Sequence, residues 1–195
     1  MRLIFSPEST QKAFQMKKQT CRINYITSAN AQQLEEAADL LDEGKGEITP
    51  LPIDRVRFRR SRKHFLAIDE SSHKVVGVAV LKDDQDDAVE IGYLRVEPAY
   101  RGQGIGTELM RIQIMEARRL KLKLIYANVK HDNQNSIAIL KNMGFQHWAS
   151  YTSGKGRGTL YWLCFYLIFV PDVNVKAIMS KKNTNLTLID SIPKL

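Results

Sequence analysis

A short glycine-rich stretch carries the residue types best suited to chemistry in this chain. It reads Arg101-Gly102-Gln103-Gly104-Ile105-Gly106, and it lies between a segment typical of a β-strand and a segment with helical spacing. The first amides of a helix lack main-chain partners, and together with the helix dipole they attract anions. Glycine also lets a ligand approach the backbone closely, because it has no Cβ. The spacing therefore predicts a bend whose main-chain nitrogens bind phosphate.

Two common phosphate-binding motifs do not fit this bend. The dinucleotide fingerprint GxGxxG fails because Thr107 stands at the position of its last glycine, and the bend is not followed by the glycine-lysine-serine/threonine step of a P-loop. Metal chemistry is not expected either. The two cysteines, Cys21 and Cys164, lie far apart in the sequence, and the four histidines show no ligand spacing.

The bend must be positioned by the elements around it, which hydrophobic periodicity predicts. Three strands before the bend, over residues 64–69, 74–82 and 88–96, are typical of an antiparallel meander. The helix that follows the bend to about residue 119 places Ile105, Leu109, Ile112 and Met115 on one apolar face. The other predicted elements are a strand at 22–27, a helix at 31–41, a strand at 122–129, a helix at 136–143 that begins at Asn133 or Asn135 and ends at Gly144, and strands at 145–151 and 159–170. The predicted fold class is α/β, with a mixed α+β sheet that is antiparallel early and has a β-α-β crossover in the middle.

The two ends of the chain show no firm periodicity. We expect a flexible leader over residues 1–20, one domain over 21–170 and a C-terminal tail over 171–195. Ser6-Pro7-Glu8 ends the first apolar residues far short of a signal peptide. The most apolar run, 160–170, has eleven residues, whereas a membrane-spanning helix needs about 20. These features favour a cytoplasmic protein with reduced cysteines and no membrane contact.

The glycine bend resembles the pyrophosphate-binding motif of the GNAT family of acetyltransferases, in which an arginine or glutamine precedes a Gly-x-Gly/Ala step. Arg101, Gly104 and Gly106 match that motif, and residues 93–100 resemble the strand and loop that approach it. A second segment, 129–145, resembles the family's stretch that ends in a Gly-Phe step. The resemblance covers roughly residues 22–168. It implies the GNAT acyl-CoA N-acyltransferase fold, a central, mostly antiparallel sheet with a splayed β-α-β slot for the cofactor.

The resemblance also implies an activity and a site. The activity is transfer of an acetyl group from acetyl-CoA to a primary amine, on a small molecule or a protein, by direct attack in a ternary complex. A backbone amide at or near Val96 would stabilise the thioester oxygen, and the neighbouring strand would splay from Tyr126 to Val129. Asn128 would bond to the pantetheine arm or a water, or it could instead cap a strand end. The implied cofactor-binding residues are Val96, Arg101, Gly102, Gln103, Gly104, Ile105, Gly106, Thr107, Asn128, Asn133 and Ser136.

Two residues are implied for proton transfer. Glu90 would remove the proton of the attacking amine through a water, because a lysine-like amine has a pKa of about 10.4; it could instead line the strand face or pair with a basic residue. Many family members carry a tyrosine that protonates the departing sulfur, and Leu140 stands at that position. Tyr126 is the candidate substitute, although a thiol with a pKa of about 8.5 can also leave as thiolate. The leucine leaves open a second function, a CoA-binding module with weak or no catalysis.

The formal net charge of +8 and the pI of about 9.5 favour anionic partners. Six of the nine residues in 55–63 are basic. They could contact a negatively charged acceptor, such as an acidic peptide or a ribosome- or RNA-associated protein. We favour a solvated helix face with Val56 and Phe58 turned inward. The charge alone suggests a third function, a basic nucleic-acid-associated protein, but nucleic acid is not expected because no reading motif is present. A homodimer stays open, because the apolar last strand could pair with a second copy.

Overall fold

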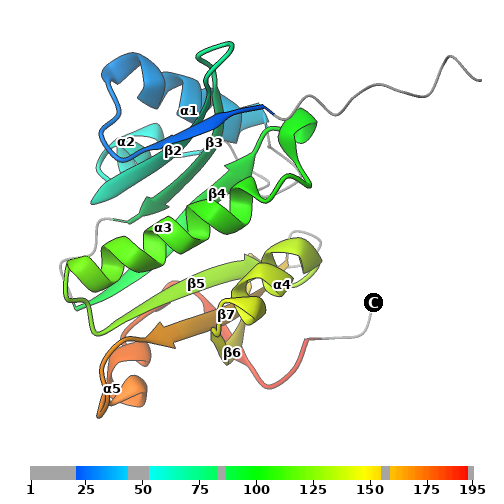
Figure 1. The fold of residues 1–195 in the computed structure, drawn as a ribbon. Helices are drawn as coiled ribbons and strands as arrows, with labels where there is room; N and C mark the ends of the chain where they lie inside the picture. The colour runs from blue at the N-terminus through cyan, green and yellow to red at the C-terminus, as the bar shows by residue number, and fades with distance from the viewer. Residues whose placement is uncertain (1–20, 44–52, 83–86, 155–158, 193–195) are drawn as a thin grey trace, which may run out of the picture.

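The computed structural model describes residues 21–43, 53–82, 87–154 and 159–192. Within them, the strands form an eight-stranded sheet in the order β1-β2-β3-β4-β5-β7-β6-β8 (Figure 1). The strands are β1 (Ile23–Ile26), β2 (Lys63–Asp69), β3 (Val75–Leu81), β4 (Ala88–Val96), β5 (Leu124–Lys130), β6 (Gln146–Ser153), β7 (Leu160–Ile168) and β8 (Thr187–Ile189). The helices are α1 (Ala31–Glu43), α2 (Arg55–Arg59), α3 (Ile105–Arg119), α4 (Gln134–Asn142) and α5 (Val175–Met179), with a 3-10 turn over Pro98–Tyr100.

The sheet is mixed and mostly antiparallel, which confirms the predicted fold class. Strands β1 to β4 pair in chain order and antiparallel, so the predicted meander is correct. Only β4 and β5 pair in parallel, and α3 connects them as the β-α-β crossover. Strand β7 lies between β5 and β6 and is antiparallel to both. The chain therefore changes from a meander to a crossover at the glycine bend.

Helices cover both faces of the sheet, and strand alternation separates their cores. Phe65 and Ala67 of β2 pack in the cluster that contains α3 and α4, whereas Leu66 and Ile68 pack in the cluster that contains α1 and α2. Figure 1 shows α3 lying along the sheet over the middle strands. All residues of β3 are buried because both of its faces are covered.

The apolar face of α3 differs from the predicted one. Ile105 and Leu109 are buried as expected, but Met115 is exposed and Ile112 is only half buried. Gln113 lies on the buried stripe, four residues after Leu109 and eight after Ile105. Because Gln113 is polar, the sequence pattern favoured its apolar neighbours Ile112 and Met115 as the buried residues. The other buried residues of α3 are Met110, Ile114 and Ala117.

The segment after residue 170, expected to be an unpatterned tail, carries regular structure. It forms α5 and β8, and β8 adds to the sheet beside β6. Met179 of α5 is fully buried with Tyr151 and Cys164. Because β7 already has a strand on each side, the expectation that this strand could pair with a second copy is wrong. Whether residues 21–170 form a separate domain stays a prediction, and the leader lies outside the described residues.

The part of the chain that the structure describes contains no helix with the length and apolarity needed to cross a bilayer.

The basic segment forms the short helix α2 and then enters β2. Phe58 is fully buried as expected, but Val56 is 55% exposed, so the expectation for Val56 is wrong. Residues two apart on a helix point about 200° away from each other, and both cannot face inward. Phe58 is the anchor of α2, with edge contacts to the rings of His64 and Tyr93.

We predict that Phe58→Ala lowers the free energy of unfolding by about 3–5 kcal/mol, the usual cost of truncating a buried phenylalanine. The matched control Val56→Ala, on the exposed side of the same turn, should change it by less than about 0.5 kcal/mol. Urea titration followed by circular dichroism measures both. Equal losses for the two variants would mean that α2 does not pack as described.

Candidate active site

The parallel pairing of β4 and β5 stops early and opens a slot in the sheet. The two strands pair from Ala88 opposite Leu124 to Glu90 opposite Tyr126. Just beyond Glu90, the register with β3 shifts by one extra residue on β4, and Tyr93 takes a left-handed φ of 52°. Such a bulge bends the strand. The slot confirms the splay implied by the family resemblance.

Two cavities meet at this slot. The glycine-bend pocket has a volume of about 840 Å³ and lies at the start of α3 and α4. The Glu90 pocket has a volume of about 850 Å³ and lies between the slot, α2 and the C-terminal segment. Leu94, Asn133 and Ser136 line both cavities, so the two adjoin at the slot.

The glycine-bend pocket brings together most of the residues implied for the cofactor. Gln103 is exposed on the bend and is not among the lining residues. Asn128 lines the Glu90 pocket instead. The implied residues that line the glycine-bend pocket are Val96, Arg101, Gly102, Gly104, Ile105, Gly106, Thr107, Asn133 and Ser136.

The bend has the backbone geometry that its sequence predicts. Gly102 and Gly104 have φ values of 75° and 81°, a left-handed conformation that favours glycine. A Cβ added at either position would meet no heavy atom within 4 Å, so both face open space. Gly104 is the N-cap of α3, and no side chain caps that end. The first amides of α3 are therefore available to an anion.

The main chain of β4 also presents an amide to the slot. The Glu97 amide donates to Val76 O at 2.9 Å, on the β3 side. Because successive residues of a strand alternate, the Val96 amide points the other way, toward β5. Its role toward the thioester oxygen stays a prediction.

A buried carboxylate holds the loop that leads into the bend. Tyr100 Oη donates to Asp69 Oδ2 at 2.6 Å, and Asp69 also accepts from Ser71 and Ser72. These bonds, that of Tyr100 first, hold the pKa of Asp69 well below its usual range, and the bond to Asp69 raises the pKa of Tyr100 to about 12. The end of β2 thus fixes the loop that leads into the glycine bend.

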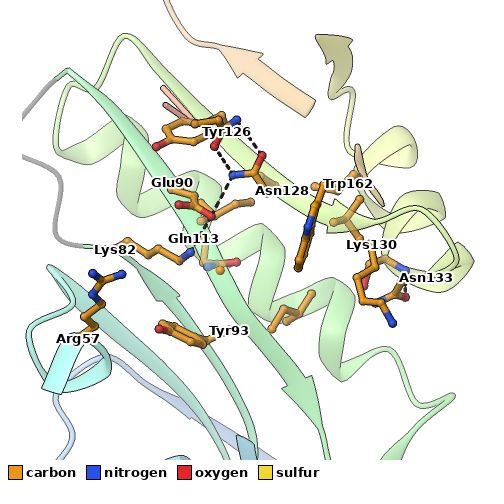
Figure 2. A pocket seen from close by; sticks show the side chains of 18 of the residues that line it. Arg57, Lys82, Glu90, Tyr93, Gln113, Tyr126, Asn128, Lys130, Asn133 and Trp162 are labelled. Atoms are coloured by element: carbon orange, nitrogen blue, oxygen red, sulfur yellow. Dashed lines mark hydrogen bonds and ion pairs between the residues drawn. The ribbon is translucent and has the colours of Figure 1, made fainter. Parts of the chain in front are cut away.

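Glu90 lines the second cavity, and Figure 2 shows it between Lys82 and Asn128. Lys82 Nζ donates to Glu90 Oε1 at 2.6 Å, and Asn128 Nδ2 donates to the same oxygen at 3.3 Å. The alternative that Glu90 pairs with a basic residue is therefore observed. The pair does not exclude a role for the carboxylate, because Glu90 still lines the cavity. Its role as a base stays a prediction.

Asn128 is tied to the C-terminal segment. Asn128 Nδ2 donates to Asn183 Oδ1 at 2.7 Å, and Asn183 Nδ2 donates back to Asn128 Oδ1 at 3.0 Å. Asn183 Nδ2 also contacts Cys164 Sγ at 3.4 Å, and burial raises the pKa of that thiol to about 12, which makes it unreactive at neutral pH. Asn128 therefore positions Glu90 and the C-terminal segment, whatever it contacts in the slot.

The remaining implied residues are placed as follows. Asn133 accepts from the Ser136 amide at 3.1 Å and so acts as the N-cap of α4, as one of the two sequence alternatives predicted. Tyr126 is buried on β5 opposite Glu90 and lines the Glu90 pocket. Leu140 lines the same pocket and has no proton to give.

Sequence reasoning missed several residues of the Glu90 pocket. Gln113, nearly fully buried, donates to Val80 O at 2.7 Å, and its Oε1 has no hydrogen-bond partner within the described residues. The sequence does contain a signal for Gln113, because a polar residue stands on the apolar stripe of α3. Lys82, Trp162 and Asn183 left no local signal, because each reaches the cavity from a different strand or loop. Among the described residues, no group of histidine, cysteine and carboxylate side chains could hold a metal ion.

The sheet is split between the parallel strands β4 and β5, and helix α3 begins at this slot without a side-chain N-cap. Together these features define the cofactor cleft of an acyltransferase. The model of the acetyltransferase (GNAT) family matches residues 31–145. The chain is 28% identical over 126 residues to the N-alpha-acetyltransferase RimI of Mycobacterium tuberculosis, covering 64% of this chain and 77% of that protein. The chain belongs to the GNAT acetyltransferase family. It is therefore an N-acetyltransferase that acts on an amine, which confirms the first of the three functions considered above.

Solved structures share the fold. A ribosomal-protein-alanine N-acetyltransferase from Brucella melitensis superposes with a TM-score of 0.62 at 22% identity, over 76% of this chain and 99% of that one. A chain of the NatC complex bound to Gag peptide and CoA superposes with a TM-score of 0.66 at 21% identity, over 76% of this chain and 99% of that one. Each of these two neighbours is matched over nearly its whole length, and the match covers about three quarters of this chain.

We predict that Tyr100→Phe lowers the melting temperature at neutral pH, because it removes a hydrogen bond to a charged, buried carboxylate. The pKa of Asp69 is lowered in the folded protein, so its stabilising contribution exists above the unfolded value of about 4 and is lost as the pH falls. The difference from the unsubstituted protein should shrink below about pH 4.

Melting curves between neutral and acidic pH measure this effect. Tyr166→Phe is the control, because Tyr166 donates to the neutral amide oxygen of Gln146 at an exposed site. Its small effect should not change with pH. A loss for Tyr100→Phe that persists in acid would contradict the Asp69 assignment.

Proposed function

We propose that this chain binds acetyl-CoA across the slot and acetylates an amine that enters through the Glu90 pocket. The observation that carries the proposal is that the two cavities adjoin, with shared lining residues, where β4 and β5 part. One cavity offers main-chain amides, and the other offers a carboxylate. The slot between β4 and β5 would therefore place the acetyl donor in one cavity next to the amine acceptor in the other.

The glycine-bend pocket fits the phosphates of the cofactor. Its bend glycines leave open space where side chains would otherwise stand, and the uncapped start of α3 offers amides. A pyrophosphate at that position would also meet the favourable end of the helix dipole. Arg101, whose Nε donates to Val96 O at 3.1 Å, adds a positive charge at the entrance. When bound, acetyl-CoA supplies a thioester, an acetyl donor whose carbonyl carbon accepts the amine.

The chain's own groups would act around that thioester. The Val96 amide points into the slot and would stabilise the charge that develops on the carbonyl oxygen. Glu90 would accept the amine proton, directly or through a water, once the acceptor lies in the cavity. Lys82 and Asn128 hold the carboxylate in place through its Oε1. Tyr126 is the candidate donor to the departing sulfur, since Leu140 cannot serve.

The acceptor that we favour is the α-amine of a polypeptide. The curated relative is named as an N-alpha-acetyltransferase, and one structural neighbour is described with a bound peptide. An α-amine has a pKa of about 8, well below that of lysine, so it demands less of the base. Two free cysteines support a reducing, cytoplasmic location.

We predict that Gly104→Glu abolishes binding of CoA while the protein still folds. The new carboxylate would stand in the open space of the bend and repel phosphate, and the left-handed φ adds a strain of about 1–2 kcal/mol. Gly144→Glu is the matched control, because Gly144 has the similar φ of 85° at the end of α4, away from the pocket. Calorimetric titration with CoA compares them. Full-strength binding by the Gly104 variant would refute the phosphate site.

We predict that Glu90→Gln slows turnover at neutral pH about 10²-fold, within the usual range for loss of a general base. The loss should be smaller at high pH, where the amine is already neutral. Lys82→Met distinguishes loss of the base from loss of the ion pair, because it breaks the contact between Lys82 and Glu90 but keeps the carboxylate. Release of CoA thiol across pH measures both variants. A uniform loss across pH for Glu90→Gln would demote Glu90 to a structural role.

A further inference from the structure

The basic segment 55–63 divides into two sets of arginines with different surroundings. Arg55 donates to Glu35, Asp39 and Asp42 of α1. Arg59, one helical turn later, donates to Glu35. These two arginines are neutralised by the acidic face of α1.

Arg57 and Arg60 lie on another side of α2 and line the Glu90 pocket. Arg57 is highly exposed, and its one ion pair within the described part of the chain is with Asp54 of the same turn, at 3.4 Å. Arg60 is exposed, and within the described residues its side chain makes no ion pair or hydrogen bond. A pair of exposed charges contributes little to stability. Folding of α2 therefore does not explain why this side is basic.

The cavity as a whole is electropositive. Among the described residues, Arg57, Arg60, Lys82 and Lys130 line it, against the single carboxylate of Glu90. Lys82 is paired with Glu90, and Lys130 lies 3.4 Å from Asp132. Among the described cations that line the cavity, Arg57 and Arg60 are therefore the two exposed ones that have no short ion pair. A cleft of one sign concentrates ligands of the opposite sign.

The cofactor's phosphates do not account for these arginines. In Figure 2, Arg57 and Lys82 lie on one side of Glu90, whereas Asn133 lies on the opposite side. Asn133 belongs to both cavities and marks the way to the glycine bend. Arg57 and Arg60 do not line the glycine-bend pocket. They line the Glu90 pocket, the cavity in which the proposed function places the acceptor.

We propose that the acceptor is an acidic amine: its amino group lies beside Glu90 and a carboxylate a short distance along the same molecule binds Arg57 and Arg60. This proposal rests on the proposed function, and it names the acceptor class. Arginine suits the role because its planar guanidinium binds carboxylates with two parallel hydrogen bonds. Polyamines and basic peptides are disfavoured, since they would bring like charge to the same rim.

The test compares three peptides that begin with the same alanine and continue with aspartates, serines or lysines. Binding to the CoA-loaded protein is measured by calorimetry, and transfer by thiol release. We expect tighter binding and higher kcat/KM for the aspartate peptide, with a preference that weakens at high salt. Free glutamate and aspartate form a separate arm, which tells whether a single amino acid suffices or a peptide is required. Equal values for the three peptides would overturn the proposal.

Variants connect the preference to the two arginines. Arg57→Ala and Arg60→Ala should each reduce the preference for the aspartate peptide by up to about fivefold, the range expected for an exposed ion pair. Arg60→Glu should favour the lysine peptide. Arg59→Ala, which removes the same charge from the side facing α1, is the control and should leave the preference unchanged.

The outcomes separate the two proposals. If none of the peptides releases thiol, the proposed function fails, and calorimetric binding still decides the preference for charge. If Arg59→Ala reduces the preference as much as Arg60→Ala does, net charge and not the pocket is responsible, and the proposal is wrong. Arg57- and Arg60-dependent binding of single-stranded RNA without any preference among the peptides would also overturn it, in favour of a nucleic-acid surface.

Discussion

Strands β4 and β5 pair over three residues and then part, and the rest of the site depends on that break. The extra residue at the Tyr93 bulge makes the break possible, because it bends β4 away from its parallel neighbour. Main-chain groups beyond the break lie along an open slot, where a polar ligand arm can satisfy them. The glycine bend lies at one end of the slot and Glu90 at the other, so the proposed place of reaction depends on an interruption of the strand pairing.

A small hydrogen-bonded network then fixes the side chains at the Glu90 end of the slot. Lys82 from β3 and Asn128 from β5 both donate to Glu90, and Asn183 is bonded to Asn128 in both directions. Because Asn183 comes from the segment behind α5, the last elements of the chain support the side chains of the central strands. Burial of Met179 anchors this segment against the sheet. Folding of the C-terminal elements and the shape of the acceptor cavity are therefore coupled.

The distribution of positive charge follows the same division of the molecule. Part of the basic segment is balanced within the fold, because Arg55 and Arg59 are bonded to carboxylates of α1. Arg57 and Arg60 remain on the wall of a cavity and are not needed to hold α2 in place. The buried ring of Phe58 performs that task. The basic residues of this segment thus divide into a set paired within the fold and a set that lines a cavity, which composition by itself cannot distinguish.

The sequence by itself determined the features that depend on a few neighbouring residues. The glycine bend, an asparagine cap at Asn133 or Asn135, and the order of strands and helices up to residue 170 follow from local backbone preferences, and the structure agrees with them and selects Asn133. Only the tertiary structure decided which distant residues meet. Glu90 and Asn128 are 38 positions apart, and Asn128 and Asn183 are 55 apart, so no local pattern could pair them. The tail and the arginines of α2 show the same limit, since their roles depend on the surface that each side chain faces after the chain has folded.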